Sequence, residues 1–397
     1  MIGISKLYCG TVESSDPLRY GRETKDLPGH LLQFSRDKKP IVVWNCTRGC
    51  NLSCVHCYSQ SANRRYDNEM TTDQGLSMLD DLSGFGVPVI LFSGGEPLLR
   101  EDLPTLIARA GQLKMSSVIS TNGTLIDQAR AEQFAQLGIS YVGISLDGMR
   151  ETNDRFRGYR GAFDKAVAGM ANCRRAGVKV GLRFTINRRN IADIADIFKL
   201  VVDEDIPRVC FYHLVYAGRG SKMMEDDLDH IQRRDVVDLI IDHTADIHGK
   251  GMFKEVLTVD NHADGPYLYM RLLKEKRSGR AAEVMRLLKM NGGNGSGIAI
   301  GCISWDGSVY ADQFWRHHSF GNVCGRKFSD IWTDTSEPLM AKLKDRKKFL
   351  KGRCATCRFL DICNGNFRVR AQAVTGSLWE PDPACYLTDD EIAVGNG

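Results

Sequence analysis

The chain has 397 residues, 43% of them hydrophobic and 26% charged, a globular composition that excludes wholesale disorder. Its 53 basic and 49 acidic residues leave a net charge of +4, too balanced for nucleic-acid binding by bulk electrostatics. The longest apolar runs have strand length, against roughly 20 residues for a membrane helix, and no basic-then-apolar leader opens the chain, so we expect a cytoplasmic protein without a membrane partner.

Residues 1–40 are polar and rich in turn-forming residues, and they predict no definite helix or strand. Beyond them, short β-branched or aromatic runs alternate with amphipathic helical patterns. Because parallel strands need the crossovers that helices supply, this alternation predicts an α/β fold with a parallel sheet. The pattern alone leaves a partial, open barrel and a doubly wound sheet both possible. Six strands are expected, at Ile41–Cys46, Pro88–Phe92, Ser117–Ser120, Tyr141–Ser145, Val178–Ile186 and Arg208–Leu214.

The second half of the chain has a different pattern. Residues 223–290 are charged and helical in pattern, without strand alternation, and Asn291–Gly297 predicts a flexible break between domains. Residues 298–397 carry cysteines and few regular patterns, so we expect a metal or cluster to staple them. The predicted organisation is an N-terminal extension, an α/β domain, a helical connecting segment and a C-terminal domain, at 1–40, 41–222, 223–297 and 298–397.

Thirteen cysteines in a chain without an export signal favour metal or cluster ligation over a disulfide framework. Cys50, Cys54 and Cys57 follow the first expected strand with the spacing C-x3-C-x2-C. Three thiolates from one loop suit a 4Fe–4S cluster in which one iron lacks a protein ligand, whereas structural zinc prefers four ligands. Cys46 or His56 could supply a fourth ligand to zinc, but we expect Cys46 to pack in the sheet and His56 to point outward.

This triplet, with Tyr58 after it, resembles the signature of the radical S-adenosylmethionine (SAM) enzymes. The resemblance implies a partial (β/α)6 TIM-like barrel, an oxygen-sensitive 4Fe–4S cluster on the three cysteines, and SAM chelated to the open iron. Ser93–Pro97, with the sequence SGGEP, Thr121–Gly123 and Ser145–Gly148 each follow an expected strand, as the corresponding family motifs do. By the resemblance, Arg157 pairs with the SAM carboxylate. The implied SAM contacts are Tyr58, Gly94, Gly95, Glu96, Asn122, Ser145 and Arg157.

A second set of cysteines has the spacing C-x2-C-x5-C-x21-C, and structural zinc is a serious alternative for such a closed set. The spacing resembles the SPASM domain of radical SAM enzymes, which implies an auxiliary 4Fe–4S cluster. Phe367 stands where those domains place a further cysteine, and Cys302 and Cys324 are too few for another site. We therefore expect two 4Fe–4S clusters in all. Like Cys302 and Cys324, the cysteines Cys9, Cys173 and Cys210 are expected to be small buried residues or to bind no cluster. The auxiliary ligands are Cys354, Cys357, Cys363 and Cys385.

Residues 7–22 and 302–323 resemble the haem d1 biosynthesis family typified by NirJ. The resemblance implies a didecarboxysiroheme substrate, an iron tetrapyrrole that loses propionate side chains through a 5′-deoxyadenosyl radical. It also implies an electron donor of the flavodoxin or ferredoxin type. Such a substrate favours arginine or lysine side chains near its carboxylates, aromatic side chains against its ring and an imidazole as axial ligand of its iron. His317 and His318 are the candidates for axial ligand or proton donor. Each arginine or aromatic candidate is more often an ordinary surface or packing residue, and the two histidines could equally be solvated loop residues. The further candidates are Arg19, Arg22, Arg64, Arg65, Arg316, Tyr310, Phe314 and Trp315.

Three alternative functions remain open at this point. One is a related tetrapyrrole decarboxylase of the alternative haem pathway, which acts on the same macrocycle but on different side chains. Another is a peptide-modifying SPASM enzyme, although residues 1–40 show no obvious segment for gripping a leader peptide. The third is a zinc-stapled binding module without enzymatic activity.

Overall fold

The computed structural model describes residues 1–13, 16–20 and 39–393. Its strands form one sheet in the order β1-β8-β7-β6-β5-β4-β3-β2-β9-β10-β11. All six expected strands are present, and each is parallel to its neighbours among them, which confirms the α/β fold with a parallel sheet. Their bounds are β2 (Ile41–Thr47), β3 (Val89–Gly94), β4 (Ser116–Thr121), β5 (Tyr141–Ser145), β6 (Val180–Ile186) and β7 (Arg208–His213).

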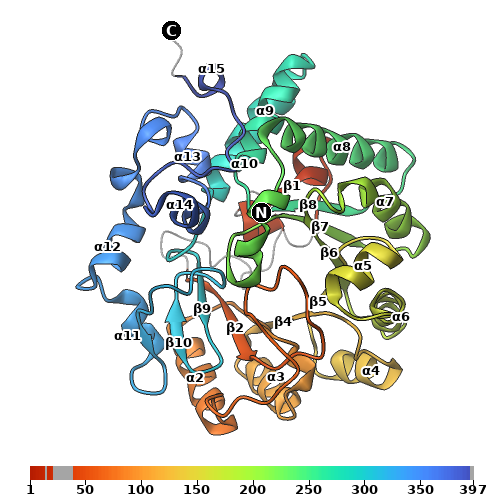
Figure 1. Ribbon diagram of the computed structural model, residues 1–397, viewed down its shortest axis with the longest axis vertical. Coiled ribbons are helices and arrows are strands. Elements are labelled where there is room, and N and C mark those ends of the chain that lie inside the picture. Colours follow the sequence, from red (N-terminus) through yellow and green to blue (C-terminus); the bar gives the residue numbers. More distant parts are fainter. Residues whose placement is uncertain (14–15, 21–38, 394–397) are drawn as a thin grey trace.

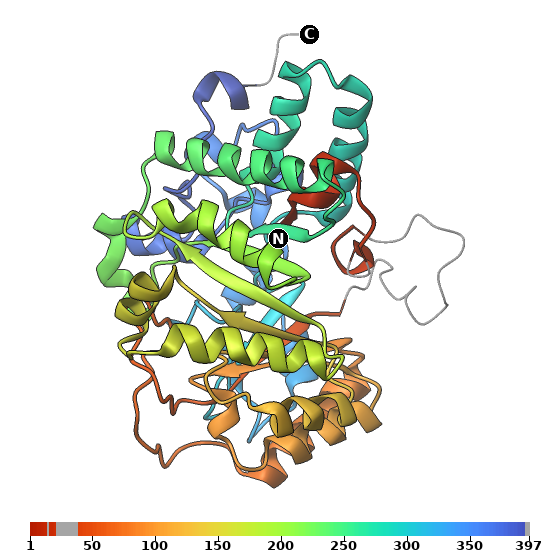
Figure 2. The same ribbon diagram turned by 90° about the vertical axis from the view of Figure 1, so that its right-hand side faces the viewer.

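Helices connect these strands and lie along the outside of the sheet (Figure 1, Figure 2). The first of them begins at Thr71 with a complete capping box, because the Thr71 hydroxyl accepts from Gln74 N and the Gln74 side chain accepts from Thr71 N. Gly138 and Gly177 follow later helices with positive φ angles, as a left-handed C-terminal position requires. The connecting helices are α2 (Thr72–Phe85), α3 (Leu103–Gln112), α4 (Gln128–Gln136), α5 (Arg150–Arg157), α6 (Ala162–Arg175) and α7 (Ile194–Asp203).

A seventh parallel strand, β8 (Glu255–Val259), lies within the segment expected to lack strands, so that expectation is wrong. All five of its residues are buried, and a short strand buried on both faces shows no polar–apolar alternation. The short β1 (Ile2–Gly3) pairs with it in antiparallel orientation. The helices around it are α1 (Asp16–Tyr20), α8 (His230–Gly249), α9 (Asp264–Lys274) and α10 (Ser278–Asn291).

At the other edge, β9 (Ile300–Ile303) pairs in parallel with β2, so the sheet continues across the predicted domain boundary. The predicted flexible break before it is a partly buried segment that packs against the C-terminal residues. Arg346 Nη1 donates to Asn294 Oδ1 at 2.7 Å, and a Cβ on Gly293 would lie 2.4 Å from the Cys363 backbone. The glycine there permits close backbone approach. The domain limits themselves stay a prediction.

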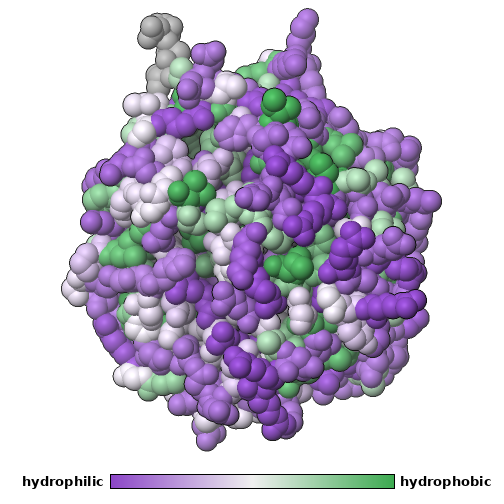
Figure 3. All heavy atoms as spheres, viewed as in Figure 1, coloured by the Kyte–Doolittle hydropathy of each residue, from purple (hydrophilic) through white to green (hydrophobic). Residues whose placement is uncertain are grey.

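The C-terminal residues contain short elements joined by loops, as the sequence indicated. After β10 (Ser308–Tyr310) and β11 (Gly321–Asn322) come only brief helices. Among the described residues, no helix is both long enough and apolar enough to cross a bilayer. The surface drawn in Figure 3 is mostly hydrophilic, with hydrophobic residues interspersed. The brief helices are α11 (Phe328–Thr333), α12 (Pro338–Lys344), α13 (Leu360–Cys363), α14 (Arg368–Thr375) and α15 (Asp389–Ile392).

The two faces of the sheet differ in their access to solvent. In β6, Leu182, Phe184 and Ile186 are buried in the core that the helices share, whereas Arg183 and Thr185 are partly accessible. The same alternation holds in β4. At β4 and β6 the inner face of the sheet is therefore partly accessible, beside the strand ends where α/β enzymes build their sites.

Candidate active site

Cys50, Cys54 and Cys57 lie in the loop that follows β2, and their side chains pack together. Two backbone hydrogen bonds, from Ser53 N to Arg157 O and from Val55 N to Phe156 O, attach this loop to the end of α5. Burial raises the pKa of Cys50 to about 12 and also raises that of Cys54. Three converging thiols in one loop fit a cluster with one open iron, and ligation to iron would compensate for the buried thiolate charge.

The residues weighed as a fourth zinc ligand lie elsewhere. Cys46 is buried in β2, as expected, and its thiol contacts Ser93 O at 3.4 Å. The expectation that His56 points outward is wrong, because its Nε2 lies 3.2 Å from the buried Asp147 Oδ2. Among the residues described here, no three His, Cys, Asp or Glu side chains are grouped to hold a single metal ion. Cys46 and His56 thus make other contacts, and zinc stays an alternative to iron at the cysteines.

Gly94 and Gly95 bring the loop after β3 against the loop after β2. A Cβ on Gly94 would lie 2.2 Å from Thr47 O, and one on Gly95 would lie 2.0 Å from Gly49 O. Gly95 N donates to Thr47 O and Glu96 N to Gly49 O, each at 2.8 Å. Only glycine fits such close backbone contact. The glycines thus position the cysteine loop, whatever they also contribute to SAM.

Glu96 joins the loops after β3 and β4. Its buried carboxylate accepts from Thr121 Oγ1 at 2.7 Å, from Asn122 N at 2.8 Å and from Leu98 N at 3.2 Å. Burial raises the pKa of Glu96 to about 7, although these hydrogen bonds act in the opposite direction. Asn122 in turn donates to Asn51 Oδ1 at 2.8 Å, inside the cysteine loop. The predicted SAM contacts Glu96 and Asn122 are therefore adjacent to the cysteines.

Arg157 lies between a carboxylate and a cysteine. Its Nη2 is 2.5 Å from Asp147 Oδ2, and its Nη1 is 3.5 Å from Cys54 Sγ. The charges of Asp147 and Cys54 raise the pKa of the guanidinium despite its burial. Ser145, at the carboxyl end of β5, lies two residues before Asp147. Pairing of Arg157 with a SAM carboxylate stays a prediction, and its buried Nε has no hydrogen-bond partner among the described residues.

Tyr58 connects the cysteine loop to the C-terminal residues. Its hydroxyl donates to Asn45 Oδ1 at 2.8 Å, and its ring meets Phe314 edge-on with centroids 5.2 Å apart. Arg316 donates to Ser59 O at 3.4 Å, and its guanidinium lies 4.1 Å from the centroid of Trp305. Of the predicted substrate residues, Phe314 and Arg316 are thus brought to the cysteine loop.

Two further predicted substrate residues, Arg19 and Trp315, are buried. Arg19 is buried and pairs with Glu255 at 2.6 Å, a contact that ties α1 to β8. Trp315 is buried in a small apolar cluster, against which Tyr58 and Phe314 pack. Both side chains are packed inside the protein, and a role for Arg19 or Trp315 in substrate binding stays a prediction.

The two predicted histidines are exposed at the surface. His318 Nε2 contacts Glu337 Oε1 at 3.1 Å, and His317 is exposed beside it. Arg64 and Arg65 are also exposed, and the guanidinium of Arg64 lies over a tyrosine ring, Tyr66, at 4.6 Å. Tyr310 is half-buried in β10. Arg22 lies outside the described residues.

Cys354, Cys357, Cys363 and Cys385 come together around α13. Burial and the neighbouring thiols of the other three cysteines raise the pKa of Cys363 well above its ordinary value. Cys357 Sγ accepts from Phe359 N at 3.4 Å, the kind of backbone contact that stabilises a ligating thiolate. Four converging thiols fit a closed set of cluster ligands.

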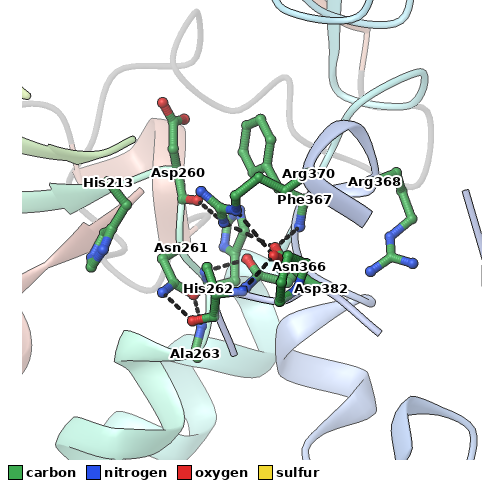
Figure 4. Close-up of polar contacts among 12 residues, drawn as sticks. His213, Asp260, Asn261, His262, Ala263, Asn366, Phe367, Arg368, Arg370 and Asp382 are labelled. Carbon is green, nitrogen blue, oxygen red and sulfur yellow. Dashed lines mark hydrogen bonds and ion pairs between the residues drawn. The ribbon is translucent and has the colours of Figure 1, made fainter. Parts of the chain in front are cut away.

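The sequence analysis missed a polar group where the C-terminal residues meet the end of β8 (Figure 4). Arg370 pairs with Asp382 at 2.9 Å and donates to Asp260 O at 2.6 Å. Asn366 Oδ1 accepts from His262 N at 2.7 Å. Because β8 itself was missed, Asp260 and His262 were not seen to follow a strand. The polar Asp-Asn-His run directly after Val-Leu-Thr-Val was the available signal.

Arg183 is a second omission. Its side chain extends across Gly143 on the inner face of the sheet, where a Cβ would lie 2.1 Å from Arg183 Nε, and it donates to Ser120 Oγ. Tyr141 and Tyr212 lie on the same face. The inner face therefore presents a cation among aromatic side chains. No sequence pattern marks Arg183, because any strand residue of that parity faces inward.

A cavity of about 570 Å³ lies at the start of α8. Tyr216, Asp227 and Arg233 line it, and Tyr216 donates to Asp227 Oδ2 at 2.6 Å. None of the predicted site residues lines this cavity. We assign the candidate site to the strand ends because the cysteines, the polar loops and the inner face meet there.

Comparison with known proteins bears on this site. Residues 44–201 match the family model described as the Radical SAM superfamily. The chain is 64% identical to the Fe-coproporphyrin III synthase of Methanosarcina barkeri (strain Fusaro / DSM 804), over 99% of each chain. It is 42% identical to the pre-heme d1 synthase of Dinoroseobacter shibae (strain DSM 16493 / NCIMB 14021 / DFL 12), over 89% of this chain and 87% of that one.

A solved structure has a similar fold. Streptococcus suis SuiB bound to S-adenosylmethionine superposes with a TM-score of 0.70, over 90% of this chain and 80% of that one. The sequence identity is 19%, so this likeness concerns the fold alone.

Proposed function

The chain belongs to the radical SAM superfamily, and from that premise we propose that it modifies an iron tetrapyrrole to form Fe-coproporphyrin III. The observation that carries this proposal is the 64% identity to a Fe-coproporphyrin III synthase over 99% of both chains. Identity sustained over this length includes the loops at the strand ends, which choose the substrate in barrel-like enzymes.

The family implies a 4Fe–4S cluster and SAM, and we assign the cluster to Cys50, Cys54 and Cys57. When bound, the pair supplies a one-electron cleavage of SAM that yields a radical able to take a hydrogen atom from the substrate. The surrounding residues hold this loop in place: Arg157 faces Cys54 at 3.5 Å, and Glu96 fixes Asn122 beside it. The proposed SAM contacts are Tyr58, Gly94, Gly95, Glu96, Asn122, Ser145 and Arg157.

The inner face supports a substrate rich in carboxylates. Arg183 offers a guanidinium on that face, and Arg316 offers another at the cysteine loop, stacked on Trp305. Guanidinium groups bind carboxylates in paired geometry, and aromatic side chains suit a flat macrocycle. We propose that the substrate lies between these two cations, close to the cysteine loop. A radical has to form within contact distance of its target, which this location allows.

We further propose an auxiliary 4Fe–4S cluster on Cys354, Cys357, Cys363 and Cys385. The four thiols converge, and their segment is held to the end of β8 through Arg370 and Asp382. The proposed electron donor is a protein of the flavodoxin or ferredoxin type.

Haem d1 synthesis is the second candidate function. It is favoured by 42% identity to a pre-heme d1 synthase and by residues 302–323, whose Phe314 and Arg316 contact the cysteine loop. The two candidates differ in product. Coproporphyrin by definition keeps its propionate side chains, whereas the haem d1 route removes propionates.

One anaerobic experiment separates the two. The protein is incubated with reductant, SAM and didecarboxysiroheme, and the tetrapyrrole product is read by mass spectrometry. We expect the mass of Fe-coproporphyrin III, with all propionates retained. Loss of propionate mass would favour the haem d1 route, and an unchanged tetrapyrrole despite SAM cleavage would overturn both. A variant with Cys50, Cys54 and Cys57 replaced by Ala is the control, and it should cleave no SAM.

A further inference from the structure

We propose that His262 binds the iron of the tetrapyrrole as an axial ligand. This inference rests on the proposed function and adds the residue that would recognise the metal of the substrate. It also replaces the sequence-based candidates, because His317 and His318 are exposed and His318 contacts Glu337.

His262 lies at the edge of the sheet where the other site residues lie. It is the third residue after β8, and the carboxyl ends of parallel strands meet at one edge. Asp260, two residues earlier, has a φ of +65°, a strained conformation for a residue with a side chain. Such strain gathers at functional sites, where the surrounding structure holds it.

The C-terminal residues hold the backbone of this loop rigidly (Figure 4). Asn366 Oδ1 accepts from His262 N at 2.7 Å, and Asn366 Nδ2 donates to Asn261 Oδ1 at 2.7 Å. Arg370 donates to Asp260 O at 2.6 Å. These contacts fix the backbone up to His262, and a fixed backbone preorganises the side chain that it carries.

The ring of His262 differs from the other interior histidine rings. His213 contacts Asp264 at 2.9 Å, His56 contacts Asp147 at 3.2 Å and His248 contacts Lys254 O at 2.8 Å, each through Nε2. The His262 ring has no hydrogen-bond partner among the described residues, although the residue is only 6% exposed. A buried polar group without a partner requires an explanation, and an absent ligand is one of the accepted ones.

The charges around His262 favour the neutral imidazole that binds iron. Burial, the Met1 amine, Arg370 and Arg346 all lower the pKa of His262 well below its ordinary value. A neutral ring need not lose a proton before it coordinates a metal. The same cationic surroundings favour the carboxylate side chains of a tetrapyrrole bound beside it.

The test uses the full-length protein and iron(III) coproporphyrin III, without SAM or turnover. Absorption and EPR spectra report the axial ligand and spin state of the bound iron. We expect His262→Ala to lose the imidazole-ligated spectrum and added imidazole to restore it. His317→Ala and His318→Ala, at exposed positions, should leave the spectrum unchanged. An unchanged spectrum in His262→Ala would overturn the inference and leave the proposed function intact.

A second variant guards against misfolding of His262→Ala. His262→Met keeps a side chain of similar length and offers a thioether, so the bound iron should show a different ligand field instead of none. A Met variant with the wild-type spectrum would also overturn the inference. Wild-type protein that binds no iron coproporphyrin would overturn the proposed function and this inference together, an outcome separate from failed ligation.

Discussion

Arg157 and Asp147 form a buried ion pair of 2.5 Å, and the same guanidinium faces Cys54 at 3.5 Å. Asp147 also contacts His56 at 3.2 Å, so one carboxylate orients two side chains around the cysteine loop. The position of this loop therefore depends on a charge supplied from the end of β5.

Asp147→Asn should destabilise the protein strongly, because it leaves the buried Arg157 without its charge partner. Removing one member of a buried pair costs about 3–5 kcal/mol. Asp164→Asn is the matched control, since Asp164 pairs with Arg150 at an exposed position. An exposed pair contributes at most about 1 kcal/mol. Urea denaturation of both variants measures the difference, and equal losses would contradict the assignment.

Gly95→Ala should prevent assembly of the first cluster. The added Cβ would lie 2.0 Å from Gly49 O, so the cysteine loop has to move. Gly111→Ala in α3 is the control, because nothing lies within 4 Å of its Cβ position. In Gly95→Ala we expect less iron after anaerobic reconstitution and no SAM cleavage. Normal iron content and SAM cleavage would show that the close contact is dispensable.

Asp260→Asn should make stability less dependent on pH. Burial raises the pKa of Asp260 from 3.8 to about 7, so the folded protein holds this proton more tightly than the unfolded chain does. The free energy of unfolding of the wild-type protein therefore falls as pH rises through that window. Asn carries no titrating group and tolerates the positive φ of this position. The stability of the variant relative to wild type should therefore increase between pH 4 and pH 7, and then level off. Denaturation at several pH values measures it, with the exposed Asp67→Asn as control.

Cys363→Ser should remove only the auxiliary cluster. Cys363 is the cysteine surrounded by the other three, so its loss opens the closed set. We expect iron to fall by about half and the first cluster to keep its response to SAM in EPR. A wild-type protein that holds one zinc and a single iron–sulfur cluster would contradict the auxiliary-cluster proposal.

Arg183→Met should weaken binding of iron coproporphyrin. Met keeps much of the side-chain length but removes the guanidinium, and a charged hydrogen bond contributes about 1.5–3 kcal/mol, or roughly a 10- to 100-fold change in Kd. Arg150→Met at the surface should not change Kd. The titration is read by absorption of the porphyrin. An unchanged Kd in Arg183→Met would place the carboxylates elsewhere.

The sequence predicted local features well and long-range ones poorly. The spacing of Cys50, Cys54 and Cys57 and the capping box at Thr71 depend on neighbours in the chain, and both appear in the structure. The contact of His56 with Asp147 joins residues far apart in sequence, so no local pattern could reveal it. Burial on both faces hid β8 in the same way.

The prediction of a flexible break at the glycine-rich residues 291–297 was also wrong. Residues 291–297 look like a flexible linker by composition, yet Gly293 is small because the Cys363 backbone lies against it. The histidines His317 and His318 were noticed because they stand side by side, whereas His262 follows a strand that was itself not predicted. Composition reports the freedom of a residue, but only the fold shows whether that freedom is used for motion or for close packing.

The pairing of β9 with β2 limits how the chain can be divided. A protein shortened before residue 298 would lose β9 and leave one side of β2, from Ile41 to Trp44, without hydrogen-bond partners. Unpaired sheet edges join other chains and aggregate. The C-terminal part is thus a cover for the strand that leads into the cysteine loop, and a separately expressed N-terminal fragment should self-associate instead of remaining monomeric.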